Sequence, residues 1–415
     1  MRKAQPSRSS RSLARRARRA ARVLLVLGTL CVLAGVCLVS CWGGLARGPR
    51  VVESLMYPTP PLVRVALAVG SAAQDLVVAV DGAYDVVDGG TGQVYASARG
   101  LPLAGIAVGE RGFRLGEQSF PAGSLRLRPR GGEPFRLNGN PYAGDLLCLR
   151  AGTGLTLVNE VDVESYLAGV IGAEMPLTFA DEALKAQAVA ARTYVLYEAK
   201  TAGTSVYDVV ATEASQVYKG LSVASSRARR LVRATTGVIA TVDGRVFPTY
   251  FHSTCGGQTT DVSTVWPSVR LGPLTGVPCG FCGASPHYRW AVEVTAEDAA
   301  RALAQRDLFS GAVTNVTVTR RGPGGFATEV EVTGPGKRTR IGAYAFRLAL
   351  GGHRVKSTNF EVTPTASGFL FQGRGFGHGV GLCQWGAAGM ARAGWNYREI
   401  LAHYYPGCHL LRIYR

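Results

Sequence analysis

Apolar and polar residues alternate with a period of two between residues 63 and 161, and turns rich in glycine interrupt the alternation about every ten residues. This pattern is typical of antiparallel strands that pack one face against a core. The segments that show it are 64–70, 75–88, 105–115, 124–130, 144–150 and 155–161. We expect this region to be a β-rich scaffold.

The spacing of apolar residues becomes helical beyond residue 163. One helix is predicted at 164–172 and a longer one from about 181 to 200, with apolar side chains at Leu184, Ala188, Ala191 and Val195. Pro176 keeps the first helix from continuing into the second, and Thr178 is expected to cap the second. Glu174 is therefore predicted to lie in the turn between the two helices.

Strand patterns return in the second half of the chain, at 237–242, 246–254, 289–295, 315–321, 327–333 and 360–364. A helix capped by Thr295 interrupts them, because Asp298 stands at capping-box distance. A glycine-rich loop at 373–381 leads to two short helices and a last strand. The predicted fold class is α+β, with antiparallel β-sheets, a few inserted helices and one N-terminal transmembrane helix in front. We divide the body into a β-rich part, 62–160, and a core, 161–415.

The predicted transmembrane helix is residues 23–45, which carry no charge and are long enough to cross a bilayer. A basic tail, 1–22, precedes it and a linker, 46–61, follows, so the positive-inside rule places the tail in the cytoplasm and the body outside. Because the apolar run is long, an uncleaved anchor is favoured over a cleaved signal peptide. Residues 38–41 also resemble a lipoprotein processing site, which would tether the body through a lipidated Cys41.

The net charge of +18 argues less for nucleic-acid binding than its size suggests. Nine basic residues, half of that charge, lie in the predicted cytoplasmic tail. The rest is spread over the body without a basic stripe that alternates with aromatic residues, so no nucleic-acid partner is expected. A basic body suits work near anionic polymers of the cell envelope.

The chemistry candidate that the pattern isolates is Glu174, which follows an apolar run and precedes Leu177 and Phe179. Such neighbours remove water from a carboxylate and keep it protonated at neutral pH, as a general acid requires. The alternative is a solvated glutamate at the end of a helix.

Six sequence words in this order resemble the family of stage II sporulation protein D and the amidase enhancers (LytB type), which remodel bacterial cell walls. They are VESYLAGVI at 163–171, AEMP at 173–176, EALKAQAVAARTY at 182–194, SQVYKG at 215–220, FHSTCGGQT at 251–259 and GHGVGLCQWGA at 377–387. The resemblance implies that 161–415 is a catalytic core of the sporulation protein D type. It also implies that Glu174 is the catalytic acid of a lytic transglycosylase.

Residues in these words are candidates for binding the sugars of the substrate: Arg192, Gln216, Tyr218, His252, Ser253, His378, Gln384 and Trp385. For Arg192 a structural ion pair is an equal alternative. Ser253 and the two histidines invite a hydrolase triad. The sequence offers neither a G-x-S-x-G elbow nor an orienting acid for one.

Six cysteines lie outside the apolar segment, and an even number in an oxidising compartment favours disulfides over a metal site. No cofactor or metal is expected on that basis. The resemblance offers a zinc site ahead of the SQVY word in some relatives, but this chain lacks its ligands, with Ala214 where a cysteine would stand. The alternative is a four-cysteine zinc site on Cys255, Cys279, Cys282 and Cys383.

The predicted function is cleavage of peptidoglycan glycan strands by a membrane-anchored lytic transglycosylase that uses one glutamate. The rival is a non-catalytic glycan-binding module that stimulates a cell-wall amidase, as the second family name implies. Both hypotheses give glycan strands and the cytoplasmic membrane as partners, and the rival adds an amidase.

Overall fold

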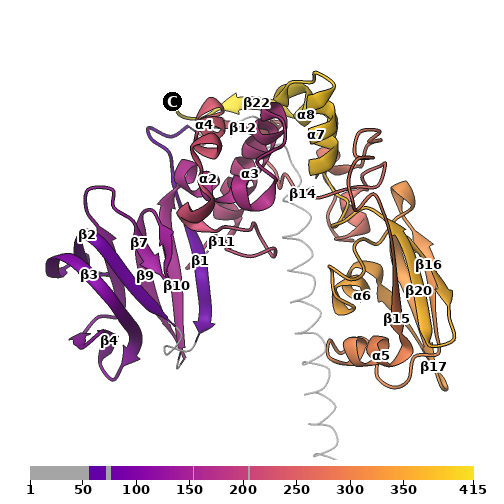
Figure 1. Ribbon diagram of the computed structural model, residues 1–415, viewed down its shortest axis with the longest axis horizontal. Coiled ribbons are helices and arrows are strands. Elements are labelled where there is room, and N and C mark those ends of the chain that lie inside the picture. Colours follow the sequence, from indigo (N-terminus) through magenta and orange to yellow (C-terminus); the bar gives the residue numbers. More distant parts are fainter. Residues whose placement is uncertain (1–55, 72–75, 153, 204–205) are drawn as a thin grey trace, which may run out of the picture. The chain divides into compact units, whose positions relative to one another are not determined.

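The computed structural model describes residues 56–71, 76–152, 154–203 and 206–415 (Figure 1). They form an α+β fold of mainly antiparallel sheets with α-helices between them, as the sequence predicts. The predicted basic tail, the transmembrane segment 23–45 and most of the linker lie outside these residues. Within the described ranges, no helix combines the length and the apolar character needed to cross a membrane.

The β-rich part is one large, curved sheet (Figure 1). Its strands follow the order β11-β1-β10-β9-β6-β2-β3-β4-β5, and β7 pairs with β2 and β8. Their bounds are β1 (Leu62–Ser71), β2 (Val77–Asp88), β3 (Val94–Gly109), β4 (Gly112–Leu115), β5 (Gln118–Phe120), β6 (Ser124–Pro129), β7 (Phe135–Leu137), β8 (Asn140–Tyr142), β9 (Asp145–Ala151), β10 (Gly154–Asp162) and β11 (Val209–Val210). Alternate apolar side chains of these strands, aliphatic and aromatic, fill its core, as the period of two predicts.

The first helix follows directly on β10, the last long strand of this sheet. The first two are α2 (Val163–Glu174) and α3 (Asp181–Thr201), which pack against each other and against β1. The others are α4 (Ser226–Ala234), α5 (Ala296–Ala304), α6 (Ala343–Ala349), α7 (Gln384–Arg392) and α8 (Tyr397–Tyr404). The helix α3 also contacts α7 and α8, so it joins segments that are far apart in the sequence.

Four small sheets complete the described fold. Two hold the helices together: β13 (Arg245–Val246), β12 (Val238–Val242) and β22 (His409–Arg412), and the parallel pair β14 (Phe251–His252) and β21 (Leu382–Cys383). The other two are β15 (Arg289–Thr295), β20 (Gly368–Arg374) and β19 (Phe360–Pro364), and β16 (Asn315–Arg321), β17 (Ala327–Gly334) and β18 (Lys337–Gly342). These last two sheets share one hydrophobic core with α5 and α6.

Three local predictions were wrong. Glu174 is the last residue of α2 and does not lie in the turn after it. Thr178 does not cap α3, whose N-cap is Ala180 without a side-chain bond, whereas Thr295 does cap α5 by accepting from the Asp298 N–H at 3.0 Å. The predicted strand 246–254 is only two short strands, because Pro248 between them has no N–H for a ladder.

Candidate active site

Glu174 is positioned by the two ends of α2. At the start, the Asp162 carboxylate accepts from the N–H groups of Glu164 and Ser165 at 3.1 and 3.0 Å, which fixes where the helix begins. At the end, the Met175 N–H donates to Ile171 O, and the chain then turns extended. Because Asp162 is also the last residue of β10, the large sheet determines where Glu174 lies.

Residues 215–223, which begin with the SQVY word and are called the SQVY segment here, pack against the side of α2 that carries Gly169 and Gly172. A Cβ on Gly169 would lie 2.6 Å from Gly220 O, and one on Gly172 would lie 2.5 Å from Val223 O. The absence of side chains at both positions therefore allows the close approach of this segment. As a result, the Val217 N–H donates to the Glu174 carboxylate at 2.6 Å.

The surroundings of Glu174 favour its protonated form. Burial raises the pKa of Glu174 to about 7, and the charge of Glu213 adds to this effect. The hydrogen bond from Val217 and the nearby amide of Gln384 act in the opposite direction and lower the pKa. Glu174 therefore exchanges its proton near neutral pH, as a group that acts first as an acid and then as a base must do.

We expect Glu174→Gln to stabilise the protein at alkaline pH. The folded-state pKa lies above the unfolded value, so ionisation opposes folding as the pH rises from below the ordinary glutamate value through about 7. The gain in free energy of unfolding should grow by about 1–3 kcal/mol from about pH 5 to about pH 8. Thermal denaturation at both pH values tests this, with exposed Glu213→Gln as the control that should change little. A gain that does not depend on pH would contradict the expectation.

Gln384 and Trp385 reach the same place from the other end of the chain. They begin α7, and the Trp385 ring packs edge-on against Phe179 with centroids 5.0 Å apart, just beyond Glu174 in sequence. The backbone N–H of Trp385 donates to Ser253 O at 3.0 Å. Gln384 is buried, and its Nε2 makes no hydrogen bond of regular geometry with any described residue. This leaves a buried amide donor beside the carboxylate.

His252 lies on β14, and His378 lies on the loop before β21, which pairs with β14 in parallel. The two ring centroids are 5.3 Å apart. His252 Nδ1 lies 3.1 Å from Val380 O and therefore carries the proton, which leaves the buried Nε2 as an acceptor without a partner among the described residues. His378 Nε2 lies 2.9 Å from Phe251 O. Burial is the main cause that lowers the pKa of both rings, so both are neutral at pH 7.

The geometry gives no support to a hydrolase triad. Ser253 Oγ pairs with Thr254 Oγ1 at 3.3 Å. His252 and His378 pair with the backbone oxygens of Val380 and Phe251. A triad needs a histidine bonded to the nucleophile and oriented by an acid. Neither bond is present among the described residues.

Three aromatic residues that the sequence did not single out form a row beside His378. Tyr250 stacks on Trp266 with centroids 4.4 Å apart and an angle of 22°, and Trp266 lies 5.6 Å from His378 and 6.2 Å from Tyr344. All three rings are half-buried. We call Tyr250, Trp266 and Tyr344 the aromatic row. Half-exposed rings of this kind are suited to stacking against the apolar face of a sugar.

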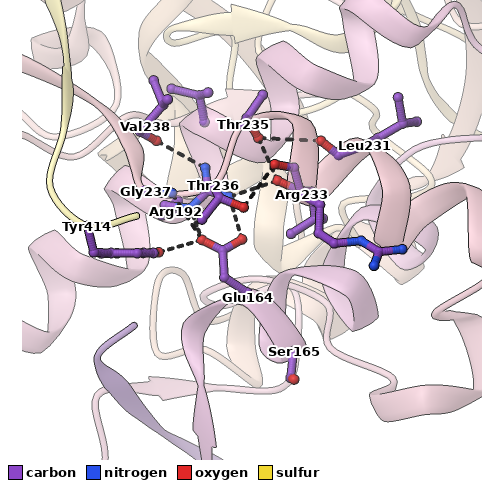
Figure 2. A network of polar contacts seen from close by, with 12 residues as sticks. Glu164, Ser165, Arg192, Leu231, Arg233, Thr235, Thr236, Gly237, Val238 and Tyr414 are labelled. Carbon is purple, nitrogen blue, oxygen red and sulfur yellow. Dashed lines mark hydrogen bonds and ion pairs between the residues drawn. The ribbon is translucent and has the colours of Figure 1, made fainter. Parts of the chain in front are cut away.

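Arg192, by contrast, is fully buried in a structural network (Figure 2). Its Nε and Nη2 donate to the Glu164 carboxylate at 3.0 and 2.7 Å, and its Nη1 donates to Val238 O at 3.0 Å. Tyr414 and the Gly237 N–H donate to the same carboxylate. The arrangement favours the ion-pair alternative for Arg192 over contact with a sugar.

Gln216 and Tyr218 also have their polar groups inside the fold. Gln216 is fully buried, accepts from Tyr166 at 2.8 Å and donates to Ala191 O at 3.3 Å. Tyr218 donates to Asn159 at 2.9 Å, and its ring packs on Tyr142 and Tyr166. We therefore assign both to positioning the SQVY segment. In the sequence, the spacing of Gly169 and Gly172 on α2 could have indicated that another segment packs closely against this helix.

A hollow of about 710 Å³ lies elsewhere, at β20 and the glycines after Cys255. Its lining includes Gly256, Tyr288, Trp290 and Arg374 and none of the predicted site residues. The four cysteines predicted as an alternative zinc site lie together and buried. They are the described residues best suited to hold a metal, and they are treated below.

Comparison with known proteins gives two family matches. Residues 151–242 match the model described as "Stage II sporulation protein", and residues 282–381 match a domain of unknown function. The first match contains Glu174 and the SQVY segment. The second contains α5, α6 and the two small sheets with the shared core.

Several curated proteins are similar to this chain. Stage II sporulation protein D of Bacillus subtilis is 32% identical over 268 residues, which cover 60% of this chain and 74% of that protein. An uncharacterised protein of Brachyspira hyodysenteriae is 35% identical over 274 residues, which cover 66% of this chain and 73% of that protein. The amidase enhancer of Bacillus subtilis is 30% identical over 285 residues, 58% of this chain and 39% of the enhancer.

Proposed function

Because the chain belongs to the family of stage II sporulation protein D, we propose that it acts on the bacterial cell wall and cleaves the glycan strands of peptidoglycan as a lytic transglycosylase. The observation that carries this proposal is Glu174, a carboxyl group whose burial raises its pKa to about 7. We assign the neutral histidines and the aromatic row to the same site, because their side chains are suited to an amino-sugar polymer.

In the proposed reaction Glu174 first gives its proton to the glycosidic oxygen, and the bond from that oxygen to the anomeric carbon breaks. The 6-hydroxyl of the same muramyl sugar then attacks the anomeric carbon, and its proton passes to Glu174. A 1,6-anhydro ring forms, no water is consumed and the glutamate regains its starting state. One carboxyl group is enough for both proton transfers.

A single-glutamate mechanism is supported because five other acids, beside α2 and in the first turn of α3, are engaged. Asp162 caps α2, Glu164 is paired with Arg192, and Asp181 is paired with Arg227 at 2.6 Å. Glu182 pairs with Lys185, and Glu160 pairs with Arg126. Two carboxylates remain to be tested as a second catalytic group: exposed Glu213, which faces His353 at 3.4 Å, and Glu198 on α3, whose pKa is raised by burial.

We propose that the aromatic row binds the sugars next to the cleavage point, together with Ser253, His378 and Trp385. Trp266→Ala should then weaken binding of peptide-free glycan strands by roughly 5- to 30-fold, which corresponds to about 1–2 kcal/mol of lost ring contact. Calorimetry in a Glu174→Gln background prevents cleavage during the measurement. Trp395→Ala is the control, since this half-buried ring packs on Phe281 and His403 instead. Equal losses in both variants would argue against the row.

The second candidate function is a non-catalytic enhancer of a cell-wall amidase, which the name of one relative favours. Product analysis separates the two functions. The protein alone, incubated with peptide-free glycan strands, should release anhydro-muramyl ends that mass spectrometry distinguishes from reducing ends. If no anhydro ends form, but an added amidase cleaves faster, the enhancer is the correct assignment.

We also propose that residues 23–45 tether the protein to the cytoplasmic membrane with its body outside. The support is the uncharged stretch behind nine basic residues. Mass spectrometry of the N-terminus distinguishes the two routes: an anchor should retain residues 23–45, whereas a lipoprotein should begin at a lipidated Cys41, and only the second form should be lost in Cys41→Ala.

A further inference from the structure

Four cysteine side chains from three distant segments meet in one buried cluster. Cys255 follows β14, Cys279 and Cys282 lie on the loop before β15, and Cys383 ends β21 and caps α7. All four are buried free thiols, and their sulfur atoms all lie within 4.8 Å of one another. We call these residues the cysteine cluster.

The spacing of the sulfur atoms fits a central metal ion. The Sγ atoms of Cys255 and Cys282 are 3.6 Å apart. Four sulfurs at the usual Zn–S distance of about 2.3 Å in a tetrahedron lie about 3.8 Å from one another. A disulfide would require about 2.05 Å. The C-x-x-C spacing of Cys279 and Cys282 is also that of a structural zinc site.

The groups around the cluster are donors that point at sulfur. The N–H groups of Cys255 and Gly386 lie 3.2 and 3.3 Å from Cys383 Sγ, and the Tyr404 hydroxyl lies 3.1 Å from Cys279 Sγ. Gly386 must lack a side chain here, because a Cβ would lie 2.6 Å from Cys279 Sγ. Donors of this kind stabilise thiolates that bind a metal.

We propose that the cysteine cluster binds one structural zinc ion as four thiolates. The ion would fasten both ends of the segment between Cys282 and Cys383, which carries the two small sheets, α5 and α6 and matches a family model of its own. It would also hold the first turn of α7, where Gln384 and Trp385 lie beside Glu174 and Phe179. This inference does not depend on the reaction proposed above.

The test is the metal content of the full chain, purified without chelator from the compartment where it matures. We expect about one zinc per chain by elemental mass spectrometry. Cys255→Ser and Cys282→Ser should each retain at most roughly one tenth of the zinc found in the wild type. Cys148→Ser and Cys408→Ser are matched controls, because these cysteines lie outside the cluster and should leave zinc unchanged.

Two measurements on the wild type keep the proposal testable if the cluster variants do not fold. Cobalt exchanged for zinc should give intense thiolate-to-cobalt absorption of a tetrahedral site, and a chelator should lower the melting temperature. A zinc-free protein whose mass is lower by four hydrogen atoms would show two disulfides and overturn the proposal. A zinc-free protein with free thiols and a melting temperature indifferent to chelator would overturn it equally.

Discussion

Glu174→Gln is expected to lower the release of anhydro-muramyl products by about 10²- to 10⁴-fold, the usual contribution of a positioned general acid. The amide keeps the shape of the side chain but has no acidic proton, while the backbone donor Val217 remains in place. Binding of glycan strands should be largely retained. Product analysis of the variant and the wild type at equal protein concentration measures the effect, and release at the wild-type rate would sink the assignment.

The matched control is Glu213→Gln. Glu213 is exposed, and its charge raises the pKa of Glu174. In the single-glutamate mechanism this variant keeps its activity. The wild-type rate should fall as the pH rises through about 7, because the deprotonated acid cannot protonate the leaving oxygen. That fall should begin at slightly lower pH in Glu213→Gln. Loss of activity as large as that of Glu174→Gln would instead indicate a two-carboxylate hydrolase.

Arg192→Ala is expected to cost about 3–5 kcal/mol of the free energy of unfolding. The substitution leaves the Glu164 carboxylate in a largely enclosed place with no cation, and it also removes the donor to Val238 O. The network joins α2 and α3 to β12 and to Tyr414, so the substitution weakens contacts between segments far apart in sequence (Figure 2). Chemical denaturation of both proteins measures it.

Arg301→Ala is the control for that experiment. Arg301 pairs with Glu297 on the exposed face of α5, and such surface pairs contribute about 0–1 kcal/mol. Glu164→Gln should also weaken the fold, because it leaves the fully buried Arg192 guanidinium without an anion. If Arg192→Ala stays as stable as the control but loses glycan binding, the sugar-contact hypothesis for Arg192 is the better one.

Local chemistry was predicted well where one residue type decides the backbone. The alternation over 63–161 gave the antiparallel strands, and Thr295 gave the cap of α5. Prediction failed where tertiary packing overrides a local signal. Thr178 lies in a suitable position but does not cap α3. The helix α4 was missed because its charged sequence, SRARRLVRA, hides three buried apolar positions.

By itself, the sequence determined the α+β class and the family and pointed to Glu174 as the candidate acid, because these depend on periodicity and on short words whose residues are neighbours in the chain. Only the tertiary structure decided which polar residues face the site and which serve the core. Arg192, Gln216 and Tyr218 lie in two other words of the same set as the word that holds Glu174, and their partners come from strands and helices tens of residues away. Burial and partner distance are properties of packed segments. The aromatic row and the cysteine cluster likewise exist only once distant loops meet.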